Sequence, residues 1–464
     1  MYETSCGVRS GVKSRIVAKD AAVLTAAALL MRLIALAYQS WLAQRIGAAG
    51  MGLWQLVLSV NVLSVTLAVS GIRFTAARLV SEELGSGGDA RAAVARCLCY
   101  AMIFGCLACL LTFFGAERIG FLWIGDARAV PCIRVFAFTL PMISLNCVLN
   151  GSFIASGKAW KSAVVQVAEQ CVNVSAVMLL LRGVTDGDLA RSCAAVARGN
   201  LIADAASLLL AAALRVLSGP ERGGKGSARL TVRMLRIALP LAVSAYARTG
   251  LSTLEHLLVP RMLRRAGLSA DASLGGYGTV TGMVFPLIAF PACLPGAVAE
   301  LTVPALTAAQ VRGERESIER TVGTLLRFTA AYSAAVAGLL FVCADALGAL
   351  VYRSAAAGRW IRLLSPLVPV MYLDIVIDGC LKGLGQMMRS MRYNLSEAAI
   401  GLILVVTLLP RFGMGGYLAM LTFCELWNFS LSYACLRRIT GRGLFPRRGK
   451  AADRPDGRPA ADAS

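Results

Sequence analysis

Apolar stretches of about 20 residues recur along almost the whole chain, and this feature constrains the fold more than any other. A helix of about 20 residues crosses the hydrocarbon core of a bilayer, because each residue adds ~1.5 Å. Only 16% of the residues are charged, whereas ordinary soluble domains have about a quarter. The chain is therefore predicted to be an all-α polytopic membrane protein. We predict twelve spans, at about 20–45, 51–72, 94–114, 130–153, 161–182, 190–216, 234–259, 276–304, 322–344, 359–382, 391–410 and 414–438.

The segment "GAAGMG", residues 47–52, interrupts the apolar sequence between the first two predicted spans. Glycine tolerates the backbone angles of tight turns and allows two helices to approach closely. The segment therefore predicts a tight hairpin outside the membrane.

Lysine and arginine are distributed unevenly between the two sides of the predicted bundle. With the N-terminus inside, cytoplasmic segments contain 30 of them, outer loops contain 14, and three lie within spans. The positive-inside rule then places both termini in the cytoplasm and predicts a multi-pass plasma-membrane protein. The net charge of +21 is concentrated in short loops and in the tail, which favours contact with anionic lipid headgroups over nucleic acid.

Fourteen cysteines and one histidine, His256, provide no cluster typical of a metal or redox site. The cysteines are interpreted as small apolar residues of the spans. The sequence contains neither a phosphate-binding loop of the form GxxxxGK[ST] nor a recognisable hydrolytic motif. We therefore expect no cofactor, no metal and no enzymatic activity.

An internal repeat divides the chain into two halves. Residues 133–181 match residues 361–409 at a constant offset of 228, with 12 identities in 49 positions. Each half has six predicted spans, an even number, so both halves begin on the same side of the membrane. This pattern predicts two parallel six-helix lobes, a kind of repeat that transporters use to build a central cavity.

The predicted organisation has five parts. They are a cytoplasmic N-terminal segment (1–19), a first lobe (20–217), a cytoplasmic linker (218–232), a second lobe (233–440) and a basic cytoplasmic tail (441–464) that is expected to be disordered. The linker is rich in glycine and basic residues, a composition that allows one lobe to rock against the other.

The stretches "RLIALAYQSWLAQRIGAAGMGLWQLVLSV" and "LAVSGIRFTAARLVSEELGSGG" resemble the first two helices of the stage V sporulation protein B family of polysaccharide transporters, within the multidrug/oligosaccharidyl-lipid/polysaccharide (MOP) exporter superfamily. In the second half, "LEHLLVPRML" and "FPLIAFPACLPGAVAELTVPAL" are similar to helices seven and eight of that family. The resemblance covers about residues 20–440 and implies a flippase for undecaprenyl-diphosphate-linked sugars. Two features differ: many members have fourteen helices, and Arg73 stands where proline is common.

Arginines near the middle of spans are candidates for substrate binding, because a charge in the bilayer costs several kcal/mol unless it is paired or hydrated. Arg32 in the first span and Arg248 in the seventh lie at similar depths, and Arg73 follows the second span. Together they predict a cationic cavity for an anionic or diphosphate substrate, since the planar guanidinium binds phosphate through two hydrogen bonds. The alternative is a structural ion pair, for which the available carboxylates are Glu255, Glu300 and Asp204.

The repeat aligns Asn146 and Asn150 with Asp374 and Asp378. In both halves the spacing of four residues places the pair on one helix face. Two buried carboxylates can share a proton or bind a cation, so Asp374 and Asp378 are candidates for coupling to an ion gradient, with Glu255 as a further candidate. The alternative is that these aspartates pair with basic residues, namely Arg359, Arg362 or Lys382.

Glu169 and Glu397 also match across the repeat, and they are interpreted as structural residues, as are Asn146 and Asn150. Three functions remain open at this point. The first is a flippase or exporter of lipid-linked oligosaccharide for cell-wall or spore-cortex assembly, working by alternating access. The second is a cation-coupled multidrug exporter, and the third is a membrane scaffold for polysaccharide synthesis that does not transport.

Overall fold

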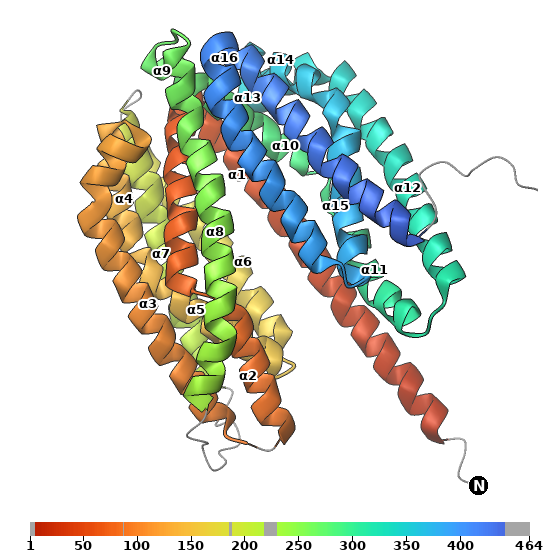
Figure 1. Cartoon of the computed structure of the whole chain (residues 1–464). Helices are drawn as coiled ribbons and strands as arrows, with labels where there is room; N and C mark the ends of the chain where they lie inside the picture. Colours follow the sequence, from red (N-terminus) through yellow and green to blue (C-terminus); the bar gives the residue numbers. More distant parts are fainter. Residues whose placement is uncertain (1–4, 87, 185–187, 218–229, 441–464) are drawn as a thin grey trace, which may run out of the picture.

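The computed structural model describes residues 5–86, 88–184, 188–217 and 230–440, and within these ranges the side chains from residue 31 onward except at 86, 159, 301 and 304. Every regular element in these ranges is helical (Figure 1). The first half contains α1 (Ser5–Val69), α2 (Ile72–Ser86), α3 (Ala90–Arg118), the π-helix η1 (Ile119–Ile124), the 3-10 helix η2 (Ala127–Ala129), α4 (Val130–Ala137), α5 (Thr139–Ala155), α6 (Ala159–Arg182) and α7 (Leu189–Val216).

The second half begins at α8 (Leu230–Arg265). It continues through α9 (Ala270–Gly278), the π-helix η3 (Thr279–Val284), α10 (Phe285–Ala289), α11 (Cys293–Val311), α12 (Arg315–Val342), α13 (Ala344–Tyr352), α14 (Ala355–Leu364), the 3-10 helix η4 (Ser365–Leu367), α15 (Val368–Gly383) and α16 (Met387–Thr440). The predicted tail and most of the predicted linker, residues 218–229, lie outside the described residues.

Nine helices in the described ranges are long and apolar enough to cross a membrane, and the pair α4–α5, bent by 42°, makes ten. Two of the nine, Met31–Gly85 and Met387–Thr440, have 55 and 54 residues, about twice the length of one span. Each contains a glycine with non-helical backbone angles, Gly47 and Gly413 respectively, where two helices join. Dividing both at these glycines gives the twelve predicted spans, and the all-α membrane fold is confirmed.

Two sets of turns define the ends of the bundle. We call them the Gly47 end, with turns at Gly47, Gly125 and Gly413, and the Gly157 end, with turns at Gly157 and Gly385. In Figure 1 the Gly47 end is at the top and the Gly157 end at the bottom.

The glycines of "GAAGMG" have two different roles. Gly47 has φ +71° and makes the turn. Gly52 lies against the start of the second half: a Cβ there would lie 2.0 Å from the carbonyl oxygen of Leu274. A Cβ on Gly278 would in turn lie 2.3 Å from the amide nitrogen of Gly52. The close approach predicted for this segment is therefore made between α1 and α9, across the two halves.

The internal repeat is visible as a repeated helix pattern. α5 ends at Ala155 and α15 ends at Gly383, and α6 and α16 begin at Ala159 and Met387, so both boundaries differ by the offset of 228 found in the sequence. Gly157 and Gly385, in the turns between these helices, have φ of +70° and +69°. The two lobes therefore share one helix order and one turn geometry.

Buried apolar side chains show how the lobes meet. At the Gly47 end one continuous core contains residues of both halves, among them Met51, Leu56, Leu274 and Tyr277. Toward the Gly157 end this core gives way to separate clusters, one around Ala76 and Val94 and another around Ile318 and Val376. The two groups of helices accordingly converge at the top of Figure 1 and diverge toward the bottom.

The helix α8 contacts both lobes. Its first half packs into the first-lobe cluster through Leu230, Met234 and Ala238. A Cβ on Gly71, between α1 and α2, would lie 2.6 Å from the Ala238 carbonyl oxygen, so only glycine permits this approach. The second half of α8 packs against α16. This crossing places α8 along the central space between the lobes.

Candidate functional site

A cavity of about 980 Å³ opens between the lobes in the half of the bundle nearer the Gly157 end. Its volume is at the upper end of the roughly 300–1,000 Å³ typical of ligand sites. It is lined by α1, α2, α5, α8, α15 and α16, and most of the lining side chains are apolar. Three basic side chains line it: Arg73 on α2, Arg248 on α8 and Lys382 on α15. We call it the cationic cavity.

The three cations differ in their partners. Lys382 forms an ion pair with Asp378 at 2.6 Å. Arg73 and Arg248 form no ion pair with any described residue. Both side chains are exposed to the cavity or its surroundings. The structure therefore places at one cavity two guanidinium groups that form no ion pair with a described carboxylate.

Arg32 is not part of this cavity. Its side chain lies on α1, is exposed, and lines neither of the two main cavities. From the sequence we expected Arg32 and Arg248 at one cavity, because their spans correspond in the repeat. In the structure the residue that shares the cavity with Arg248 is Arg73, because the first half of α8 packs beside α2. A role of Arg32 in substrate binding stays a prediction.

The repeat-related polar pairs make equivalent contacts within each lobe. Asn146 donates to the Ser207 hydroxyl at 2.9 Å, which joins α5 to α7. In the second lobe Asn428 donates to Asp374 at 3.0 Å, which joins α15 to α16. The second oxygen of Asp374, Oδ1, is buried and has no hydrogen-bond partner among the described residues.

Asp378 and Asn150 complete these pairs. Asn150 donates to Asn146 at 3.1 Å. Asp378 accepts a hydrogen bond from Ser390 and pairs with Lys382, one of the basic partners that the sequence left open. The structure thus separates the two aspartates: one is ion-paired at the edge of the cationic cavity, and the other keeps a free carboxylate oxygen.

A second cavity of about 550 Å³ is acidic. Glu255 of α8 and Glu397 and Glu425 of α16 line it, together with His256 and Tyr417. Glu255 lies directly against α16, because a Cβ on Gly401 would be 3.2 Å from its carboxyl carbon. We call this the acidic cavity.

The acidic cavity joins residues to which the sequence gave different roles. Glu255 was a candidate for coupling, whereas Glu397 was interpreted as structural with its repeat partner Glu169, which is half-buried in the first lobe. Glu425 was missed, although its place near the middle of an apolar span is itself the signal of a functional carboxylate. The repeat did not reveal it, because Glu425 lies outside the matched segments.

The sequence profile of the polysaccharide biosynthesis protein family matches residues 17–290. The chain belongs to this family. It is 23% identical over 417 residues to stage V sporulation protein B of Bacillus subtilis, which covers 87% of this chain and 80% of that protein.

Solved structures of the MOP superfamily have the same fold. An inward-facing multidrug resistance MATE family transporter matches with a TM-score of 0.68 at 15% identity, over 89% of this chain and 96% of that one. The lipid II flippase MurJ in an inward closed conformation matches with a TM-score of 0.70 at 11% identity, over 89% of this chain and 87% of that one. This member of the polysaccharide biosynthesis protein family therefore has the multi-pass membrane fold of these MOP superfamily structures.

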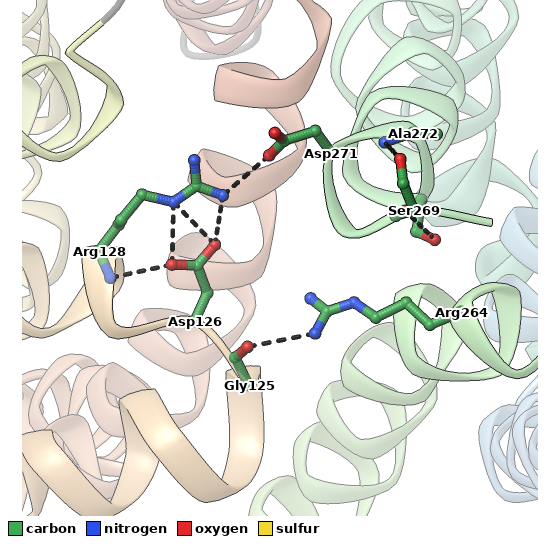
Figure 2. A network of polar contacts seen from close by, with 8 residues as sticks. Gly125, Asp126, Arg128, Arg264, Ser269, Asp271 and Ala272 are labelled. Atoms are coloured by element: carbon green, nitrogen blue, oxygen red, sulfur yellow. Dashed lines mark hydrogen bonds and ion pairs between the residues drawn. The ribbon is translucent and has the colours of Figure 1, made fainter.

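In this protein the lobes are joined at the Gly47 end by polar contacts, drawn in Figure 2. Arg128 of the first lobe pairs with Asp126 at 2.7 Å and reaches across to Asp271, in the first turn of α9, at 3.0 Å. From the opposite direction Arg264, in the last turn of α8, donates to the Gly125 carbonyl at 3.2 Å. The central space is thus closed at the Gly47 end, whereas the cationic cavity lies toward the Gly157 end.

Proposed function

We propose that the protein is a transporter that moves a lipid-linked saccharide with a phosphate or diphosphate headgroup across the membrane. The observation that carries this proposal is that two arginines, Arg73 and Arg248, line one cavity between the lobes and form no ion pair with a described carboxylate. Family membership supports the same class of substrate, because the matched family is described by polysaccharide biosynthesis. The similarity to stage V sporulation protein B supports a role in cell-wall or spore-cortex assembly.

The chemistry of arginine favours a phosphate ligand over a neutral or cationic drug. Each guanidinium offers two parallel N–H donors to a phosphate and remains charged in an apolar site. Lys382 adds a third positive charge, partly balanced by Asp378. The apolar remainder of the lining, such as Phe74 and Ile154, suits the part of the substrate next to the headgroup.

The excess of lysine and arginine supports the orientation. Lys158, in the turn between α5 and α6, and Lys382, in the last helical turn of α15, lie at the Gly157 end, and the positive-inside rule assigns this end to the cytoplasm. In this orientation both termini are cytoplasmic, and the cationic cavity faces the side on which lipid-linked precursors are made. Alternating access would then close the Gly157 end and open the Gly47 end.

The acidic cavity is the proposed site of ion coupling. Glu255, Glu397 and Glu425 line one space, and like charges so placed favour the uptake of a proton or a cation. Asp374 does not line this cavity, but its Oδ1 has no hydrogen-bond partner among the described residues, and it is a further candidate for coupling. Glu255 and Arg248 lie two turns apart on α8, so one helix touches both cavities.

Substitution of the two arginines tests the substrate. Arg248→Gln and Arg73→Gln remove charge-assisted hydrogen bonds worth ~1.5–3 kcal/mol each, so each should lower headgroup affinity about 10- to 150-fold. Arg248→Lys retains the charge but loses the paired donors and should have a smaller effect. Arg327→Gln is the matched control, because Arg327 is also an exposed arginine within a span and lines neither cavity.

The assays are binding of a fluorescent polyprenyl-diphosphate sugar to purified protein and complementation of a deletion strain. Normal binding and complementation by the Arg73→Gln/Arg248→Gln double variant would refute the anionic substrate. The acidic cavity favours one alternative, a cation-coupled exporter of cationic drugs. That function predicts drug binding that is lost in Glu255→Gln and unchanged in the arginine variants.

A further inference from the structure

Two arginines at the Gly47 end converge on one glycine. The guanidinium nitrogen Nη1 of Arg264 lies 3.5 Å, and Nε of Arg261 lies 3.9 Å, from the position that a Cβ on Gly125 would occupy. Gly125 ends the π-helix η1 and has φ +74°. Its carbonyl oxygen accepts a hydrogen bond from Arg264. Figure 2 shows Arg264 extending toward this carbonyl from the opposite lobe.

The positive charge at this point is not balanced by the described residues. The nearby carboxylates, Asp126 and Asp271, are both engaged by Arg128. Arg264 keeps only the Gly125 carbonyl, and its Nε and Nη2 atoms are buried without a hydrogen-bond partner in the described part of the chain. Buried donors of a charged group that lack an acceptor are costly, on the order of 1–3 kcal/mol or more. Such a group gains strongly from an anionic ligand.

We propose that Arg261 and Arg264 form a binding site for a phosphate-type oxyanion at the Gly47 end, which opens when the lobes separate there. In the closed state the Gly125 carbonyl occupies one donor of Arg264 and covers the site. In the open state Gly125 moves away with the first lobe, and the oxyanion takes its place between the two guanidinium groups. The anion binds only the open state, so its binding shifts the equilibrium toward opening.

This site extends the proposed function. The identity of its natural ligand rests on that function, whereas the site itself does not. A diphosphate headgroup held first by Arg73 and Arg248 would meet a second pair of arginines at the opposite end of the path. The same chemistry is offered by an anionic lipid headgroup of the outer leaflet. Both sources supply a phosphate oxyanion, and the experiment separates them.

The test uses the purified full chain in nanodiscs of phosphatidylcholine, with inorganic diphosphate as the probe. The background carries Arg73→Gln and Arg248→Gln, so that the cationic cavity does not contribute. In this background diphosphate should still bind and should lengthen the distance between spin labels placed on the two lobes at the Gly47 end. Adding Arg264→Gln or Arg261→Gln should weaken this binding at least tenfold and abolish the diphosphate-induced opening.

Arg265→Gln is the matched control, because Arg265 is adjacent and exposed and its one hydrogen bond to a described residue is with the Met262 sulfur. It removes the same charge and should change the affinity less than threefold. Equal weakening by Arg265→Gln and Arg264→Gln would show a diffuse charge effect and overturn the proposal. Unchanged diphosphate binding in Arg264→Gln would overturn it as well.

Replacing phosphatidylcholine by phosphatidylglycerol separates the two sources of the oxyanion. If a lipid headgroup occupies the site, phosphatidylglycerol weakens diphosphate binding in the background protein and leaves the Arg264→Gln protein unaffected. If it does not compete, the site serves the substrate. Failure of the proposed function has a different signature, namely normal transport by the Arg73→Gln/Arg248→Gln protein, which leaves the Arg264 result standing.

Discussion

Replacing Gly52 or Gly278 by alanine should open the Gly47 end. These two glycines allow α1 and α9 to touch through their backbones, and this contact holds the lobes together. A Cβ on Gly52 would lie 2.0 Å from the Leu274 carbonyl oxygen and 2.7 Å from its carbonyl carbon. Because these are backbone atoms of another helix, no side-chain rotation can relieve the clash, and the two helices must move apart.

The magnitude follows from the overlap. An ordinary contact needs a separation of about 3.4 Å, so the helices must separate by more than an ångström at this point. Overpacking of this kind costs ~1–3 kcal/mol, and the penalty falls only on the state in which the lobes touch. The equilibrium between closed and open at this end should therefore shift about 5- to 150-fold toward open.

The shift can be measured by pulsed EPR with spin labels at Arg191 in the first lobe and Arg411 in the second, in a background without reactive cysteines. The long-distance population should grow in Gly52→Ala and in Gly278→Ala. Gly415→Ala is the control, since a Cβ at Gly415 has no heavy atom within 4 Å. By linkage, Gly52→Ala should also strengthen diphosphate binding at Arg264 by the same factor.

Two results would refute this reasoning. If Gly52→Ala has the distance distribution of the parent, the α1–α9 contact does not control opening. If Gly415→Ala opens the Gly47 end as much as Gly52→Ala, the effect is a general loss of stability and not a specific clash.

Three further predictions concern other parts of the molecule. Arg128→Gln removes the pair with exposed Asp271; such pairs contribute ~0.2–1 kcal/mol, so pulsed EPR should show a shift of less than about fivefold toward open. Asp374→Asn keeps an acceptor for Asn428, so expression should be near normal, while substrate uptake into proteoliposomes should lose its response to a proton or sodium gradient. Gly385→Ala, at φ +69°, should cost ~1–2 kcal/mol and lower the midpoint of thermal unfolding, with Gly415→Ala nearly neutral.

The fold was largely predictable because the bilayer imposes a simple length rule. Apolar segments near 20 residues located the twelve spans, and the offset of 228 anticipated the matching ends of α5 and α15. Packing between distant helices was not predictable in the same way. Gly52 meets Gly278, and α8 lies beside α2. These contacts depend on the sizes of side chains on two facing helices, which the periodicity of a single sequence does not reveal.

The same limit applies to the site. Depth in the membrane singled out Arg248, which lines the cavity between the lobes in the structure, but depth alone suggested Arg32 as its neighbour. The neighbour is Arg73, because two helices that correspond in the repeat need not lie together when one of them crosses between lobes. Glu425 could have been found from its position within a span, whereas its meeting with Glu255 and Glu397 required the structure.

The contrast between the lobes argues that the carboxylate of Asp374 serves more than packing. In the first lobe the contact between the helices is made by a neutral pair, Asn146 and Ser207. In the second lobe the repeat-related Asp374 makes an equivalent contact with Asn428. Since an amide suffices for the contact in one lobe, the contact does not by itself require a charge in the other. A charge in the bilayer is costly, and Asp374 also leaves one oxygen without a partner among the described residues. A group whose charge is unnecessary for packing and whose oxygen is free is suited to take up and release an ion during transport.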